Sequence, residues 1–318
     1  MEALLSGATA ARSFELSMRL QCPRCQTPMP TACCRQCGFV LREENGIWKA
    51  MPEERHAYFE QFIIDYERIR AAEGRGSLAA DFYINLPYKD ASSRNQQQWA
   101  IRAQTFRYLI RNLLAPSRAN APLRVLDIGA GNGWLSFRLS LAKYEPVAVD
   151  LLTNEFDGLG AAMHFRHLLA KPFPRFQAES AHLPFANAQF DVAIFNASFH
   201  YSENYRQCLA EALRCLRTGG MVAICDSPWY AADESGKRMV EERHQHFIAK
   251  FGTASDSIRS LEYLTDERLE DLERHFSIQW QVHAPWYGLQ WAMRPLIAKL
   301  RGRREPSRFR IYTARKAP

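Results

Sequence analysis

The stretch VLDIGAGNGWLS, residues 125–136, constrains the fold more than any other part of the 318-residue chain. Glycines stand at alternate positions, Gly129, Gly131 and Gly133, directly after an apolar run. Side chains there would keep the backbone away from a ligand, so loops of this kind hold nucleotide-type cofactors between a strand and a helix. The position of the loop alone leaves NAD, FAD and S-adenosylmethionine as alternatives.

From Arg124 onward, short apolar runs alternate with helical stretches. This alternation predicts an α/β fold with a doubly wound parallel sheet and helices on both faces. Strands are predicted at 123–129, 145–152, 175–180, 190–198, 219–227, 277–285 and 307–315. Helices are predicted at 133–143, around 160–169, at 205–216, near 236–250 and at 264–276.

Three regions are predicted: an N-terminal segment with a cysteine cluster (1–50), a helical lid and linker (51–118) and the sheet domain (119–318). Helical spacing of apolar residues places helices in the middle region from about 53 to 73 and from 99 to 114. This region is expected to cover the cofactor, with Tyr83, Tyr88 and Trp99 as aromatic residues that shield it from water. The chain starts without the pattern of a signal peptide, and its apolar runs are too short to cross a bilayer. We therefore expect a soluble, cytoplasmic protein.

The spacing of the glycines separates the cofactor alternatives. The dinucleotide fingerprint is G-x-G-x-x-G, and Trp134 occupies its third glycine position here. Asp127 stands two residues ahead of Gly129, where a carboxylate suits a cationic ligand end such as the ammonium group of S-adenosylmethionine. Asp150, 21 residues after Gly129, is placed to accept the ribose hydroxyls, and Glu179 to accept from the adenine amino group.

Four segments, VLDIGAGNGWLSFRL, VAVD, AESAHLPFANAQFDVAIFNASFHY and EALRCLRTGGMVAICDS, resemble the successive motifs of class I S-adenosylmethionine-dependent methyltransferases. The most similar subgroup is the small-molecule type that includes ubiquinone and menaquinone methyltransferases. The resemblance implies a seven-stranded Rossmann-like sheet whose last strand is antiparallel. It places Asp127, Gly129 and Gly131 at the methionine end, Asp150 at the ribose and Glu179 at the adenine, where aspartate is more usual. The predicted cofactor-binding residues are Asp127, Gly129, Ala130, Gly131, Asp150, Leu151, Glu179, Ser180 and Asn196.

The acceptor pocket is expected beyond the fourth strand of the sheet domain, in NASFHYSENY. His200 and Tyr201 are the candidate catalytic residues, because a histidine there can take a proton from a phenol or enol hydroxyl. A purely structural role for His200 remains open, as does a turn-forming role for Asp226. The N/D-P-P-Y/F signature of amino-group methylation is absent from the sequence, which favours an oxygen or carbon acceptor on a small molecule.

The segment CPRCQTPMPTACCRQCG has the spacing Cys22-x2-Cys25-x8-Cys34-x2-Cys37. Two C-x-x-C pairs can supply four thiolates to a tetrahedral structural zinc, although Cys33 competes with Cys34 as a ligand. The segment resembles zinc ribbons that precede several bacterial methyltransferases, one group of which methylates guanine in ribosomal RNA. RNA methylation is therefore the alternative function, and a non-catalytic cofactor-binding protein is a third.

Positive charge is concentrated at the end of the chain. Residues 289–318 hold nine basic residues against Glu305 alone, whereas the whole chain has a formal net charge of +7. Apolar residues from Leu289 to Leu300 recur at near-helical spacing, and Pro295 is expected to start the helix. An anionic membrane surface, an acidic ligand, RNA, or no partner at all remain open for this segment.

Overall fold

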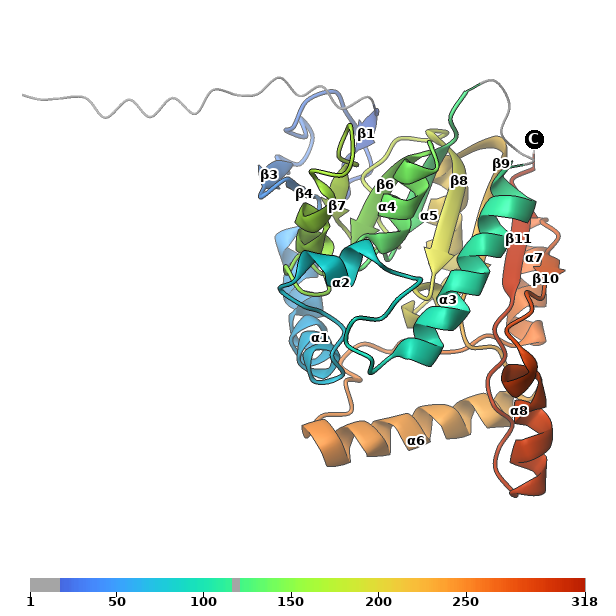
Figure 1. Ribbon diagram of the computed structural model, residues 1–318. Coiled ribbons are helices and arrows are strands. Elements are labelled where there is room, and N and C mark those ends of the chain that lie inside the picture. Colours follow the sequence, from blue (N-terminus) through green and yellow to red (C-terminus); the bar gives the residue numbers. More distant parts are fainter. Residues whose placement is uncertain (1–17, 116–120, 318) are drawn as a thin grey trace, which may run out of the picture.

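A computed structural model describes residues 18–115 and 121–317, so residues 1–17 and the predicted boundary between 118 and 119 lie outside its described part. Within that part, nine strands form one sheet in the order β10-β11-β9-β8-β5-β6-β7-β4-β3 (Figure 1). The strands are β3 (Arg42–Glu44), β4 (Ile47–Lys49), β5 (Arg124–Ile128), β6 (Glu145–Asp150), β7 (Arg175–Gln177), β8 (Phe190–Asn196), β9 (Leu216–Cys225), β10 (Gln281–His283) and β11 (Ile311–Arg315).

The predicted doubly wound α/β sheet is confirmed. Strands β7, β6, β5, β8 and β9 pair in parallel, and β11 pairs antiparallel with both β9 and β10. The chain moves outward from β5 to β6 and β7, then returns to place β8 on the other side of β5. Strand order reverses at this point, which opens a crevice at the carboxyl ends of β5 and β8 for a ligand.

Helices cover both faces of the sheet, because neighbouring strand residues point to opposite sides. The helices are α1 (Glu53–Ala72), α2 (Ala80–Ile84), α3 (Gln96–Tyr108) continued by the π-helix η1 (Leu109–Leu114), α4 (Trp134–Leu141), the 3₁₀ turns η3 (Leu159–Phe165) and η4 (Phe199–Tyr201), α5 (Tyr205–Cys215), α6 (Asp233–Phe251), α7 (Asp266–Phe276) and α8 (Leu289–Leu300). Val125 and Ala223 belong to the apolar cluster under α3, α4 and η3, whereas Leu126 and Val222 belong to the cluster under α5 and α7.

The N-terminal segment is built into the sheet. A small two-stranded sheet, β1 (Leu20–Gln21) with β2 (Pro28–Met29), carries the first cysteine pair. The hairpin β3–β4 turns at Asn45 and Gly46, both in the left-handed region that such tight turns require. Strand β4 then pairs in parallel with β7. The domain boundaries stay a prediction, but this hairpin belongs to the same sheet as β5, the strand that precedes the glycine loop.

Helix α8 departs from expectation. Pro295 lies inside the helix instead of starting it, so that prediction is wrong. Proline removes one backbone hydrogen bond, and the cost is tolerable here because α8 buries none of its residues and water can reach the freed carbonyl. Figure 1 shows α8 together with α6 at the end of the molecule remote from the cysteine-bearing segment.

Candidate functional site

The glycine loop joins β5 to α4 at the carboxyl edge of the sheet. Backbone N–H groups of Gly129 and Ala130 both donate to the Val149 carbonyl, at 2.8 and 3.0 Å, which holds the loop against β6. Gly129 has φ of +75°, and a Cβ there would lie 2.2 Å from the Cβ of Ser198. Only glycine therefore allows the loop to pass so close to the chain that follows β8.

Asp150, the last residue of β6, is fixed by two backbone donors. Its Oδ2 accepts from the N–H of Gly131 at 2.7 Å, and its Oδ1 accepts from the N–H of Leu152 at 2.8 Å. Burial raises the pKa of Asp150 to about 6 despite these hydrogen bonds. Each oxygen keeps a second lone pair, so the carboxylate can still accept hydrogen bonds from two hydroxyl groups of a ligand.

Asp127 is the most deeply buried carboxyl of the site, with 1% of its surface exposed. Its Oδ2 accepts from the hydroxyl of Ser136 at 2.7 Å, but its Oδ1 has no hydrogen-bond partner among the described residues. Burial raises its pKa to about 7. An unpaired buried oxygen is costly, and a cationic ligand group would relieve that cost.

Glu179 follows β7 and already has strong partners. Arg55 donates to both of its oxygens, at 2.8 and 2.7 Å, and His182 lies 3.0 Å from Oε1. Although burial raises the pKa of Glu179, these partners more than offset it and hold the pKa below its usual value, while the pKa of His182 rises. A carboxylate accepts about four hydrogen bonds, so little capacity remains for an adenine amino group.

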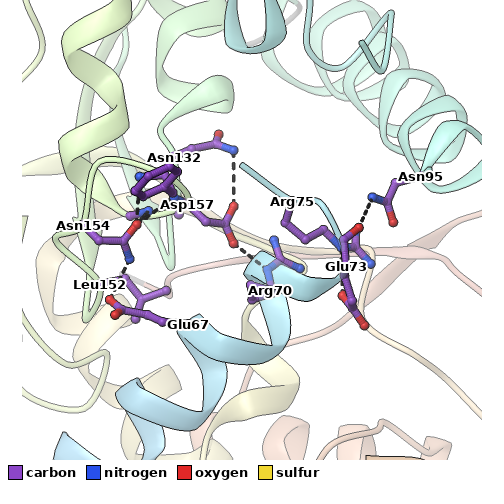
Figure 2. Close-up of polar contacts among 12 residues, drawn as sticks. Glu67, Arg70, Glu73, Arg75, Asn95, Asn132, Leu152, Asn154 and Asp157 are labelled. Atoms are coloured by element: carbon purple, nitrogen blue, oxygen red, sulfur yellow. Dashed lines mark hydrogen bonds and ion pairs between the residues drawn. The ribbon is translucent and has the colours of Figure 1, made fainter. Parts of the chain in front are cut away.

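One face of α1 forms a wall of the site. Arg55, Phe59, Phe62, Tyr66 and Arg70 recur three or four residues apart and all line one cavity. At the end of this stripe, Arg70 Nε donates to Asp157 Oδ2 at 2.5 Å (Figure 2).

The same Asp157 accepts a hydrogen bond on its other oxygen. Asn132, in the glycine loop, donates to Asp157 Oδ1 at 3.5 Å, and Figure 2 shows Asp157 between Asn132 and Arg70. Helix α1 and the glycine loop are thereby joined through one carboxylate.

Two cavities meet at this wall. The first lies over the glycine loop, and the second lies beyond the ends of β8 and β9. Residues that line both are Phe62, Tyr66, Arg70, Arg102, Ala197 and Tyr201. The guanidinium carbon of Arg102 lies 4.7 Å from the centroid of the Trp99 ring. In the described part of the chain, no carboxylate oxygen lies within 4.0 Å of the Arg102 nitrogens. A ligand in one cavity is therefore adjacent to a ligand in the other.

All nine residues predicted to bind the cofactor line the first cavity. Of three aromatic residues expected to shield the cofactor, Trp99 lines this cavity, whereas Tyr83 is buried against the carbonyls of Ser77 and Phe156 and Tyr88 packs on Arg138. The stripe on α1 and Arg102 were not among the site residues predicted from the sequence. Helical spacing of aromatic and basic residues was the available signal.

The two candidate catalytic residues, His200 and Tyr201, differ in which cavities they line. Tyr201 lines both cavities, with its ring 5.6 Å from that of Tyr66. His200 lines only the second cavity and faces the Ser227 hydroxyl at 3.3 Å. Burial, together with the charges of Arg243 and Arg102, lowers the pKa of His200 to about 3. The ring is thus neutral at physiological pH but a weak base.

The cysteine cluster is formed by the four predicted residues. Ligand atoms of Cys22, Cys25, Cys34 and Cys37 all lie within 4.8 Å of one another. Sulfur pairs Cys22–Cys37 and Cys25–Cys34 are each 3.5 Å apart. Cys33 is exposed and outside the cluster, so Cys34 is the residue placed to bind a metal. Four sulfurs at this spacing fit a tetrahedral zinc with bonds of about 2.3 Å.

A doubly wound sheet with an antiparallel last strand, a glycine loop after its central strand and acidic residues after the next two strands is the arrangement typical of class I methyltransferase domains. Consistent with this class, residues 126–224 match a family model described as "Methyltransferase domain". No helix in the described ranges is long and apolar enough to cross a membrane.

Several known proteins are similar in sequence to part of this chain. A malonyl-[acyl-carrier protein] O-methyltransferase of Geobacter sulfurreducens is 26% identical over 51% of this chain and 54% of its own. One of Hahella chejuensis is 32% identical over 36% of this chain and 40% of its own. A demethylmenaquinone methyltransferase of Deinococcus radiodurans is 26% identical over 55% of this chain and 76% of its own. The chain thus spans about half the length of the first of these relatives.

Proposed function

We propose that the protein transfers a methyl group from S-adenosylmethionine to an oxygen or carbon atom of a small-molecule acceptor. The donor occupies the first cavity and the acceptor the second. Asp127 binds the ammonium group of the donor, and Asp150 binds the ribose hydroxyls. When bound, the donor supplies an already activated methyl group, so the chain's task is to align the two ligands and exclude water.

The unpartnered Oδ1 of Asp127 is the observation that carries this proposal. Asp127 lines the first cavity together with a second carboxylate, Asp150, and neither has a cationic partner within 4.0 Å among the described residues. A pyrophosphate would be repelled by these two carboxylates, whereas an ammonium group would be attracted. This charge pattern supports S-adenosylmethionine over NAD.

The helical region before the sheet closes over the donor in this proposal. Phe59, Phe62 and Tyr66 on α1 and Trp99 on α3 supply apolar cover for the first cavity. Slower backbone hydrogen exchange in residues 53–114 with S-adenosylhomocysteine is the expected result. Unchanged exchange would refute the lid.

The cysteine cluster holds a structural zinc ion. Its ligands come from the two knuckles at Cys22–Cys25 and Cys34–Cys37, and Cys22 and Cys34 are buried in the core that also contains residues of the main sheet.

The comparisons do not support the RNA alternative. Of the basic residues near the C-terminus, Arg304 and Arg308 pair with Glu242 and Glu305, which leaves fewer of them free for an anionic partner.

Calorimetry with S-adenosylhomocysteine and NAD tests the donor assignment. We expect binding of the first and none of the second, and Asp150→Ala should weaken the first by roughly 1–3 kcal/mol. Asp256→Asn, an exposed carboxyl, is the matched control. Tight binding of NAD would contradict the proposal.

A further inference from the structure

The second cavity contains a carboxylate that the proposed donor site does not use. Asp226 follows β9 directly, lines this cavity and is 4% exposed. Its Oδ2 has no hydrogen-bond partner in the part of the chain that the structure describes. Its φ of +52° lies in the left-handed region, which costs free energy for a residue with a side chain. Local strain and an unsatisfied buried oxygen at one residue are typical of a functional site.

A hydrogen-bond chain fixes the orientation of this carboxylate. Thr105 on α3 donates its hydroxyl hydrogen to Asp226 Oδ1 at 2.6 Å. Since that hydrogen is then used, the Tyr287 hydroxyl, 2.9 Å from Thr105 Oγ1, must be the donor in the second contact. These hydrogen bonds leave Oδ2 as the carboxylate oxygen without a partner among the described residues.

The charged and titratable groups around Asp226 favour its use as a proton acceptor. Burial raises its pKa, and the positive charge of Arg102 on α3 opposes part of that rise. Tyr287 and Cys225 are the other titratable neighbours, and burial raises the pKa of both, so each stays neutral. Asp226 is therefore a stronger base than an exposed carboxylate.

Other polar groups of the cavity are less suited to this task. His200 is a weak base, because its pKa lies at about 3. Arg70 is paired with Asp157 and Arg243 with Glu262, although that glutamate keeps one unpartnered oxygen of its own. Glu262 does not line either cavity, whereas Asp226 does.

We propose that Asp226 Oδ2 accepts the hydroxyl hydrogen of the methyl acceptor, which makes the acceptor a phenol or an enol. This inference rests on the proposed function, since the donor must occupy the adjoining cavity. In the reaction, the acceptor oxygen forms a bond to the methyl carbon while the methyl–sulfur bond breaks and its electron pair remains on sulfur. The hydroxyl proton passes to Asp226, which releases it to solvent after the methoxy product leaves.

Asp226→Asn tests the role directly. Asparagine adopts the left-handed region readily and keeps the hydrogen bond from Thr105, so the variant should fold with an unchanged or higher melting temperature. We expect its affinity for S-adenosylhomocysteine to stay within twofold of the wild type. Asp256→Asn, at an exposed carboxyl, controls for loss of a carboxylate.

Activity is measured with methyl-tritiated S-adenosylmethionine and fractions of a small-molecule cell extract, and mass spectrometry identifies the methylated atom. For the wild type, we expect a methoxy product on an aromatic or enol oxygen. For Asp226→Asn, we expect at least a 100-fold loss of turnover and a pH profile without the fall in activity at acid pH that the wild type shows. Turnover within threefold of the wild type, or methylation of a carboxylate, amine or carbon, would overturn the Asp226 assignment alone. A wild type that binds the donor but methylates no fraction would refute the proposed function and, with it, this inference.

Discussion

The guanidinium of Arg55 donates to both carboxylate oxygens of Glu179, which joins the first turn of α1 to the segment after β7. The preceding residue, Glu54, accepts a similar pair of hydrogen bonds from Arg24, at 2.8 and 2.7 Å. Arg24 lies between two of the clustered cysteines, Cys22 and Cys25. Two ion pairs thus fix the start of α1. The Arg24–Glu54 pair joins it to the cysteine cluster, and the Arg55–Glu179 pair joins it to the lining of the first cavity.

Replacing Arg55 by alanine separates two roles for Glu179. If Glu179 accepts from adenine, Arg55 competes for the same oxygens, so Arg55→Ala should keep or strengthen binding of S-adenosylhomocysteine while Glu179→Ala weakens it. Because Arg55 is about one-third exposed, its ion pair should contribute only ~1 kcal/mol to folding. Calorimetry and chemical unfolding of both single variants and the double variant measure these effects. An equal loss of affinity in both single variants would show that the pair acts as one unit.

Loss of the metal ligands should affect the whole domain. Cys22→Ser with Cys37→Ser is expected to remove one zinc per chain and to lower the melting temperature, since Cys22 belongs to the apolar core shared with the main sheet. Elemental analysis and thermal unfolding are the measurements. The exposed Cys33 provides the control, because Cys33→Ser should retain the metal. Full zinc content in the double variant would disprove the ligand assignment.

Binding of the donor should release a proton from Asp127. Its pKa of about 7 means that this carboxyl is roughly half protonated at pH 7, and an ammonium partner favours the ionised form. Since the folded pKa lies above the unfolded value of about 3.9, its contribution to stability is complete below that value and is lost as pH rises through about 7. Calorimetry with S-adenosylhomocysteine in buffers of different ionisation enthalpy measures the release. Asp127→Asn should abolish it and flatten the pH dependence of unfolding; release that persists in this variant would contradict the assignment.

Alanine at Gly129 should destabilise the protein more than alanine at a comparable glycine. Gly129 and Gly219 share a left-handed φ, of +75° and +73°, but only at Gly129 would the new Cβ meet another side chain, that of Ser198. The excess cost should be about 1–3 kcal/mol by chemical unfolding. Adding Ser198→Gly to Gly129→Ala should recover part of it. Equal costs at the two glycines would show that backbone strain alone matters.

Local signals account for what the sequence predicted. Strands β5, β6, β8 and β9 contain short apolar runs, and the polar residues near their carboxyl ends must converge once the sheet is parallel. That reasoning placed Asp127, Asp150 and Asn196 around one cavity without any knowledge of packing. Their roles in binding stay predictions.

Nonlocal packing explains what was missed. Arg55 and Arg102 reach the cavities from helices that precede the sheet, and helical spacing alone does not say which face of a helix packs inward. The pairing of β4 with β7 joins residues more than 120 positions apart, and neither strand predicts its partner. The helix expected around 160–169 is a short 3₁₀ turn, where Gly158 and Gly160 pack tightly against the backbone of 152–154.

The pairing of β4 with β7 also determines which strand the sheet presents to other molecules. Without the hairpin, β7 would carry unpaired backbone groups at the rim, and such rims recruit strands from neighbouring chains. With the hairpin in place, the rim is β3, whose Arg42, Glu43 and Glu44 are all exposed and charged. Charged side chains disfavour strand addition, so the hairpin β3–β4 is expected to lower the tendency of the chain to associate through this edge of the sheet. A chain stripped of its metal would be expected to form oligomers through β7 even while its glycine loop remained folded.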